Sequence, residues 1–440
     1  MPETTNTTRR TLLKGAGVAA LSTTVAGCAL LDGGQATEEE VEGIPDEPFR
    51  LTHMTFESGP AAFYGEQAVN ALELLVDDIN AEGGLLGERE IDVVETIDEG
   101  AGADTLVSDT QRLGQQDETD LLFGVISSAN LLAVAPTADE QQLPFIATIA
   151  GTYQLFEENP EMEYVARTCA TNSAGAVSAA RVVAEMEDVE TVVTIDQDYA
   201  WGHDHRDMVI AVLEGLRPDI DIVESRTPEP FISDYSAHVS AIQDRGPDVL
   251  MSSLWGGDIA TFMNQAVDEG LFDDVGTGVL MGDTGSPLLQ SLGGDVPENV
   301  LLGGRGGYQF NFRAEENPLQ REFAEAYLDA YGEYPGWGAY HTWQGVRALE
   351  VGVERVVDIT GNWPTDSQLI SAISNVSFNS PGGMHTITDY QAVAPGVYGR
   401  PVTSESAQEY ELTDYQVVSP VDCNPPQGVP TMEYVETITE

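Results

Sequence analysis

The hydrophobic positions of this chain alternate between two spacings. Short apolar runs have the spacing of buried strands, and the stretches between them carry apolar residues at every third or fourth position, as amphipathic helices do. The first strand is expected at residues 50–56, and the turn Gly59-Pro60 and a long helix follow it. One face of that helix holds Val69, Leu72, Leu75, Val76 and Ile79. Gly83 and Gly84 are expected to end it, because glycine adopts the positive φ of a helix terminus.

This alternation of strands and helices occurs twice. It runs from residue 49 to about residue 167, and then again over a comparable length to about residue 287. A glycine-rich passage at 301–310 is interpreted as a crossover strand, and three helices without intervening strands follow it. The carboxyl region is rich in proline and glycine and is expected to form short strands. The pattern predicts an α/β protein with two units built on parallel sheets.

The loops that follow the predicted strands contain most of the candidate binding residues. Ligands of open α/β sheets bind at the carboxyl ends of the strands, so these loops are expected to face a ligand. In the first unit they contribute Tyr64, Ser127, Ser128, Ala150 and Thr152, and in the second unit Tyr199, Trp201, Trp255 and Asp283. Hydroxyl and backbone N–H groups near helix starts suit a carboxylate. Aromatic rings can enclose an apolar side chain, and Asp283 can face an ammonium group.

Each of these residues also has a purely structural interpretation. A single serine or aromatic residue in a loop more often packs or caps a helix than binds a ligand. The recurrence of such residues at the same end of both predicted sheets favours the binding interpretation.

The charge balance is strongly acidic. The 440 residues include 74 acidic and 18 basic side chains, which gives a formal net charge of −56, and Lys14 is the only lysine. Nucleic acid and anionic membranes would repel such a chain. Molar salt shortens the Debye length to about 3 Å and so reduces the self-repulsion. The composition therefore indicates adaptation to high salt rather than an acidic binding face.

The amino terminus has the pattern of an export signal. Arg9-Arg10 precede an uncharged apolar run at 15–27, and small residues directly precede Cys28. We interpret residues 1–27 as a twin-arginine signal peptide and Cys28 as a lipidated residue, which would anchor the mature protein at the extracellular face of the cytoplasmic membrane. Residues 28–48 are then an acidic tether.

Catalytic and metal-binding patterns are weak. His203 and His205 lie close together but have no third ligand placed by the sequence, so no metal and no cofactor are expected. The chain has no GxSxG, no HExxH and no phosphate-binding glycine loop before a lysine, so we do not expect an enzyme. Cys169 and Cys423 could form a disulfide outside the cell or remain as two buried thiols, and both alternatives stay open.

Several segments, in the same order, resemble one known family. These are GPAAFYGEQ…DDINAEGGLLG, the second strand with Asp98, the serines at 127–128, LPFI, DYAWG, NPLQREFAEAYLDAYGEYP and SPGGMHTITDYQA. The chain resembles the solute-binding proteins of ABC transporters in the leucine/isoleucine/valine class, over nearly the whole mature length. The resemblance implies a type I periplasmic-binding-protein fold, with two doubly wound parallel-sheet lobes joined by three crossovers. By this analogy lobe 1 is 49–167 plus 309–385, lobe 2 is 168–308 plus 386–425, and 426–440 is a C-terminal tail.

The same resemblance implies roles for individual residues. Contacts to the α-carboxylate of a ligand fall on Ser127, Ala150 and Thr152, with Tyr64 at the rim of the cleft. Contacts to the ammonium group and side chain fall near Tyr199, Trp255 and Asp283. The chain departs from the family at 147–150, where a serine-proline-glycine turn is common, and at Asp283, where a glutamate is common.

The departures widen the expected ligands from branched-chain amino acids to related amides and urea. The implied function is a monomeric receptor that binds its ligand between closing lobes and delivers it to an ABC permease in the membrane. A ligand sensor with the same fold is the first alternative, and an extracellular hydrolase is a distant one.

Overall fold

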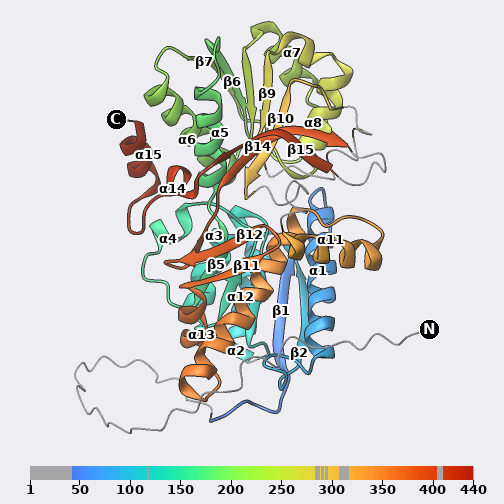
Figure 1. The fold of residues 1–440 in the computed structure, drawn as a ribbon, viewed down its shortest axis with the longest axis vertical. Helices are drawn as coiled ribbons and strands as arrows, with labels where there is room; N and C mark the ends of the chain where they lie inside the picture. The colour runs from blue at the N-terminus through green and yellow to red at the C-terminus, as the bar shows by residue number, and fades with distance from the viewer. Residues whose placement is uncertain are drawn as a thin grey trace. The chain divides into compact units, whose positions relative to one another are not determined.

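The predicted alternation of strands and helices forms two α/β lobes (Figure 1). The computed structural model describes residues 42–116, 118–282, 288, 292, 296–306, 317–403 and 410–439. The proposed signal peptide, Cys28 and Asp283 lie outside these residues.

The first lobe is built on an eight-stranded sheet with the order β11-β12-β13-β5-β4-β3-β1-β2. Its strands are β1 (Phe49–Thr55), β2 (Ile91–Asp98), β3 (Leu121–Gly124), β4 (Phe145–Ala147), β5 (Val165–Ala170), β11 (Val376–Ser380), β12 (Gly383–Thr388) and β13 (Gln391–Val393). Its helices are α1 (Ala62–Ala81), η2 (Glu99–Ala101), α2 (Ala103–Gln116), α3 (Ser128–Glu140), α4 (Gln154–Glu158), α11 (Pro318–Tyr331), α12 (Trp337–Thr360) and α13 (Asp366–Ile373). Strands β1 to β5 pair in parallel, and β11, β12 and β13 pair antiparallel with one another.

The second lobe contains a seven-stranded sheet with the order β15-β14-β10-β9-β8-β6-β7. Its strands are β6 (Thr191–Ile195), β7 (Asp221–Arg226), β8 (Val249–Ser252), β9 (Thr277–Leu280), β10 (Val300–Arg305), β14 (Gly396–Thr403) and β15 (Tyr410–Val418). Its helices are α5 (Asn172–Ala184), α6 (Ala200–Leu216), α7 (Ser236–Arg245), α8 (Gly256–Asp268), α9 (Leu271–Asp274), α14 (Pro420–Cys423) and α15 (Thr431–Thr439). Strands β14 and β15 pair antiparallel at one edge, so both sheets are mixed, with the predicted parallel strands at their centres.

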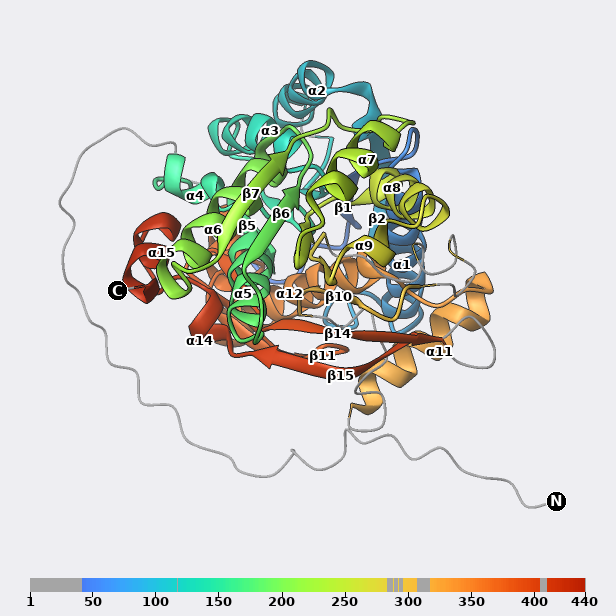
Figure 2. The same ribbon diagram turned by 90° about the horizontal axis from the view of Figure 1, so that it is seen from above.

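The lobe boundaries differ in detail from those implied by the resemblance. Strand β5 belongs to the first sheet and continues to Ala170, three residues beyond the expected change at residue 167. The first sheet also extends to Val393 rather than to residue 385, because β12 pairs with β13, and β13 pairs in parallel with β5. The segment expected as a tail contains α15, which packs against α6 beside α14 and α5 (Figure 2).

Helix α1 shows how the sequence positions the cleft. The predicted stop is confirmed, because the helix ends at Ala81 and Gly83 and Gly84 have φ angles of 100° and 89°. A Cβ on Gly84 would come within 2.1 Å of the Arg89 carbonyl oxygen. The buried face includes Leu72 and Val76 as predicted, but it is centred on smaller residues where α12 packs against it. This packing places the first turn of α1 between the lobes.

Candidate ligand-binding cleft

A cluster of aromatic side chains joins the two lobes. We call it the interlobe cluster; its buried members are Ala61, Tyr64, Ala68, Ile126, Ile149 and Trp337 from the first lobe and Trp201 and Trp255 from the second. Phe56, Phe63, Tyr199 and Phe231 pack around it and are partly buried. The ring centroids of Tyr64 and Trp255 are 5.8 Å apart, and those of Tyr64 and Trp337 are 5.5 Å apart. The structure thus brings together four of the predicted residues, Tyr64, Tyr199, Trp201 and Trp255.

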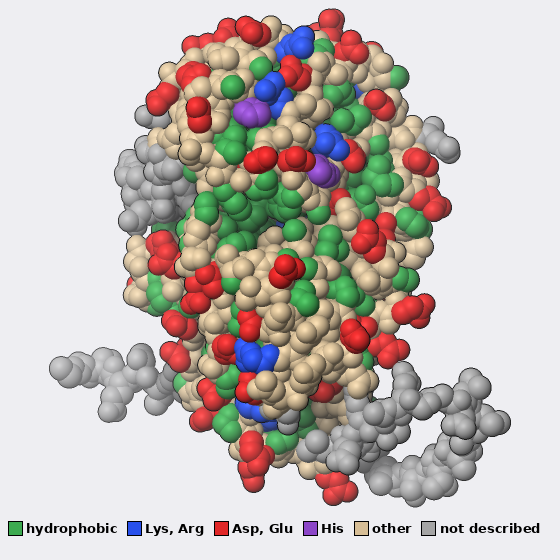
Figure 3. All heavy atoms as spheres, turned by 180° about the vertical axis from the view of Figure 1, so that it is seen from behind, with side chains coloured by type: hydrophobic (Ala, Val, Ile, Leu, Met, Phe, Trp, Pro, Cys, Tyr) green, Lys and Arg blue, Asp and Glu red, His purple; other side chains and the backbone are tan. Residues whose placement is uncertain are grey.

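The position of each aromatic ring follows from the strand-loop-helix connections. Tyr64 lies in the first turn of α1, Trp201 in the first turn of α6, and Trp255 directly precedes α8. Each of these helices follows a strand of its own sheet, so the rings meet at the carboxyl ends of β1, β6 and β8. Figure 3 shows apolar side chains gathered around a hollow on one face of the molecule.

Two of the three indole N–H groups in the cluster have protein acceptors. Trp255 Nε1 donates to the Tyr199 hydroxyl at 2.6 Å, and Trp201 Nε1 donates to the Ser253 carbonyl at 3.0 Å. Burial raises the pKa of Tyr199 well above its ordinary value, so the hydroxyl stays protonated. Trp337 Nε1 is buried and has no acceptor among the described residues. Trp337 is a cluster residue that the sequence interpretation missed.

Arg305 is a second residue that the interpretation missed. It is fully buried, and its guanidinium carbon lies 5.1 Å from the Trp201 ring centroid and 5.2 Å from that of Trp337. Its Nη2 donates to the Ile149 carbonyl at 3.1 Å. A Cβ at Gly151 would approach Arg305 Nη1 to 2.0 Å, so a glycine is needed there. The signal in the sequence was a single arginine within the glycine-rich crossover strand.

Ser127, one of the two serines expected to bind a carboxylate, already contacts a carboxylate of the protein. Ser127 caps α3, and its backbone N–H donates to Glu99 at 3.0 Å. Ile126 N and Asn130 Nδ2 donate to the same carboxylate at 2.6 and 3.0 Å. Burial raises the pKa of Glu99 to about 7, although these hydrogen bonds oppose the shift. Ser128 begins α3 and is buried.

Ala150 and Thr152 also have partners within the chain. Ala150 N donates to the Val125 carbonyl at 3.0 Å. The Thr152 hydroxyl donates to Asp204 at 2.7 Å, and Gln154 and Asn172 donate to the same carboxylate at 2.6 and 2.8 Å. Burial raises the pKa of Asp204 to about 6. Because Asp204 lies on α6 and Thr152 on the loop before α4, this contact links the lobes.

The histidines and cysteines have structural partners. His203 contacts Asp198 at 2.7 Å, and His205 is buried against Trp201, where burial lowers its pKa to about 3. The described residues contain no group of three or more side chains that could hold a metal ion. Cys169 and Cys423 are both buried and are not joined by a disulfide, so of the two open alternatives the structure has the thiols.

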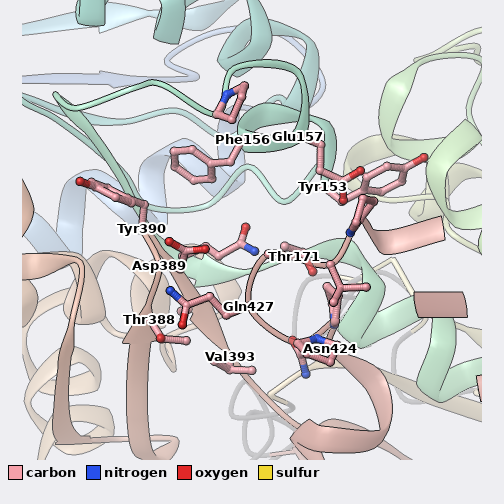
Figure 4. Close-up of a pocket in the computed structure, with 18 of the residues that line it drawn as sticks. Tyr153, Phe156, Glu157, Thr171, Thr388, Asp389, Tyr390, Val393, Asn424 and Gln427 are labelled. Atoms are coloured by element: carbon pink, nitrogen blue, oxygen red, sulfur yellow. The ribbon is translucent and has the colours of Figure 1, made fainter. Parts of the chain in front are cut away.

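Two cavities adjoin these elements. One, of about 480 Å³, lies at the rim of the cleft between the start of α1 and the start of α8, and we call it the rim cavity. The other, of about 420 Å³, lies away from the interlobe cluster, beside the segments that connect the lobes. Figure 4 shows Tyr153 on one side of this second cavity and Asp389 and Tyr390 on the other.

The chain is similar to known binding proteins. Residues 48–403 match the family model described as "Periplasmic binding protein". The Leu/Ile/Val-binding protein homolog 8 of Brucella abortus is 26% identical over 295 residues, which cover 64% of this chain and 70% of the relative.

Solved structures share the fold at lower identity. A solute-binding protein of an ABC transporter from Rhodopseudomonas palustris, in complex with 3,4-dihydroxybenzoic acid, has a TM-score of 0.72 at 21% identity and covers 84% of this chain and 98% of that one. The LivJ protein from Streptococcus pneumoniae, in complex with isoleucine, has a TM-score of 0.68 at 20% identity, with 84% and 99% covered. In the described part of this chain, no helix is both long and apolar enough to span a membrane.

Proposed function

The chain belongs to the periplasmic binding protein family, and we propose that it is the exported receptor of an ABC importer that captures a small organic acid or amino acid. The observation that carries this proposal is the interlobe cluster, in which aromatic residues of both lobes meet at the carboxyl ends of their strands. A ligand that contacts both lobes binds the closed form better than the open form and so shifts the population toward closure.

The relatives narrow the ligand class. Relatives named for leucine, isoleucine and valine, and structural neighbours solved with isoleucine or hydroxylated benzoic acids, share a carboxylate next to an apolar group. Tyr64, Trp201 and Trp255 supply the flat apolar walls that either kind of ligand needs. We propose these three residues as ligand contacts, with Ser128 and Tyr199 beside them, and Asp283 remains a proposed contact in the second lobe.

The remaining features of the proposed receptor come from the sequence. We propose export by the twin-arginine route, a lipid on Cys28, a monomeric state and function in high salt. Mass spectrometry of the membrane fraction tests the anchor: Cys28→Ser should lack the lipid mass and appear in the medium. Membrane retention of this variant would contradict the lipid anchor without affecting the proposed ligand class.

A thermal-shift screen in molar KCl tests ligand capture. The probes are the branched-chain amino acids, small amides, benzoate and its hydroxylated forms. A true ligand at 100 times its dissociation constant should stabilise the folded chain by about 2.7 kcal/mol. If no probe raises the melting temperature, the proposed ligand class is wrong.

A further inference from the structure

Arg305 lies where the two lobes meet. It is the last residue of β10 in the second sheet, and its side chain is fully buried. We propose that Arg305 is a positioning residue that fixes the Trp201 and Trp337 rings, which come from different lobes, relative to each other. The inference rests on the proposed function and goes beyond it, because it names the residue that sets the spacing of aromatic side chains in the interlobe cluster.

The first lobe holds the guanidinium of Arg305 through two carbonyl groups. Nη2 donates to the Ile149 carbonyl at 3.1 Å, and Nη1 donates to the carbonyl of Ala170, the last residue of β5. The Arg305 backbone, in contrast, pairs with Gly396 of β14 in the second sheet. A guanidinium has five N–H donors in one plane and can therefore serve two carbonyls at once. Arg305 is thus attached to the second lobe by its backbone and to the first lobe by its side chain.

The same guanidinium lies over one indole ring from each lobe. Its central carbon is 5.1 Å from the ring centroid of Trp201, on α6 of the second lobe. It is 5.2 Å from the ring centroid of Trp337, at the start of α12 in the first lobe. Arginine stacks on aromatic faces, and the attraction is stronger where water is excluded. Both indoles are almost fully buried, so a displaced guanidinium is expected to loosen both rings.

The place of Arg305 in the chain suits a fixed support. Ala170 stands just before the chain passes from β5 of the first lobe to α5 of the second. Gly306, which follows Arg305, donates its N–H to the Pro395 carbonyl at 2.7 Å, in the passage from β13 to β14. Arg305 and Gly306 therefore join segments at which the chain crosses between the lobes. Groups close to a hinge move least when lobes rotate, so a support placed there can keep its contacts during closure.

Two glycines provide a matched test of this role. A Cβ at Gly151 would approach Arg305 Nη1 to 2.0 Å, and the end of a long side chain can move away from it. A Cβ at Gly175 would meet Arg305 Cγ at 3.6 Å, which is an ordinary van der Waals contact. Neither glycine has a positive φ angle, so alanine suits both backbones. Gly151→Ala should therefore displace the guanidinium, and Gly175→Ala should leave it in place.

Acrylamide quenching of tryptophan fluorescence tests the position of the rings without any ligand. The mature, ligand-free chain is measured in molar KCl. We expect the quenching constant to rise in Gly151→Ala, because the loosened rings admit the quencher, and to stay at the wild-type value in Gly175→Ala. An unchanged quenching constant in Gly151→Ala, or an equal rise in both variants, would overturn the positioning role.

Arg305→Lys separates the guanidinium from the direct effect of the new methyl group. This second variant is needed because a Cβ at Gly151 would also come within 3.1 Å of Trp201 Cζ3. Lysine keeps the positive charge, but its ammonium group is a point charge that cannot stack on two rings and serve two carbonyls as the planar guanidinium does. The quenching constant should rise in Arg305→Lys as in Gly151→Ala. A wild-type value in Arg305→Lys would contradict the role of the guanidinium.

Titration calorimetry with L-leucine and 4-hydroxybenzoate in molar KCl connects the rings to ligand capture. A probe that binds the wild type should bind about tenfold more weakly to Gly151→Ala and to Arg305→Lys, and equally well to Gly175→Ala. If the quenching constant rises and the affinity does not change, Arg305 does not position the rings for the ligand and the inference is wrong. If neither probe binds the wild type, that result counts against the proposed ligand class, whereas the quenching constants still decide whether Arg305 holds the rings.

Discussion

Two buried carboxylates, Glu99 in the first lobe and Asp204 in the second, differ in where their hydrogen-bond donors lie. Glu99 accepts its three hydrogen bonds from residues of the first lobe only. Asp204 lies on α6 of the second lobe and accepts hydrogen bonds from Thr152 and Gln154 of the first. We expect the first contact to be insensitive to the separation of the lobes, and the second to require that the lobes lie together. Glu99 should therefore govern folding, and Asp204 should govern the equilibrium between open and closed forms.

The largest expected effect comes from removing Glu99. Glu99→Ala leaves Ile126 N, Ser127 N and Asn130 Nδ2 without their acceptor inside the first lobe. Urea unfolding should show a loss of about 3 kcal/mol. The exposed Glu88→Ala on the same lobe should change the free energy of unfolding by less than about 0.5 kcal/mol. A loss for Glu99→Ala no larger than for Glu88→Ala would contradict its structural role.

The pH dependence of stability should follow the raised pKa of Glu99. Its pKa is about 7 in the folded state, whereas an exposed glutamate has a pKa near 4.3. The folded state holds the proton more tightly, so this contribution to stability is complete below pH 4 and is lost as the pH rises through about 7. Between pH 5 and 7.5 the contribution of Glu99 should fall by about 2 kcal/mol.

Urea unfolding at both pH values, in constant molar salt, measures this effect. Glu99→Gln keeps a side-chain oxygen as acceptor but cannot titrate, so its stability should fall less over the same interval. An identical fall in the wild type and in Glu99→Gln would show that other groups cause the pH dependence.

The smallest expected effect concerns the contact that links the lobes. Thr152→Val removes one donor to Asp204, and should cost about 1 kcal/mol in favour of the open form. Small-angle scattering of the ligand-free chain should then show a larger radius of gyration. The free energy of unfolding of the lobes, measured in urea on the intact chain, should change little. Thr148→Val is the control, because the buried Thr148 hydroxyl has no partner among the described residues. A similar expansion in both variants would mean that the Asp204 contact does not hold the lobes together.

Much of the fold could be predicted from the chain. The two-lobed α/β fold of the type I periplasmic binding proteins is confirmed by the sheets and by the structural neighbours. The parallel centres of both sheets were predicted, but their antiparallel edges were not, because the strands after α13 return as antiparallel hairpins. Short strands separated by turns carry no local signal of which sheet they join, so the sequence did not indicate that β13 pairs with β5.

The sequence predicted several residues of the candidate site, but it did not predict the contacts that they make. Tyr64, Trp201 and Trp255 meet between the lobes, as expected of strand-end loops. Trp337 and Arg305 were missed because one starts a helix with no preceding strand and the other lies within a strand. Neither residue lies in a loop that follows a strand, which is where ligand-binding residues were expected.

The sequence alone determined the order of strands and helices, the loops that face the cleft and the acidic surface, since these depend on local spacing and composition. Only the tertiary structure decided which polar groups are available to a ligand. Ser127 and Thr152 look like free donors in the sequence, yet their acceptors lie 28 and 52 positions away along the chain. Gln67, in contrast, has a buried amide oxygen without a donor among the described residues. Hydrogen-bond partners are chosen by distance in space, and for residues so far apart in sequence that distance is set by the packing of the lobes.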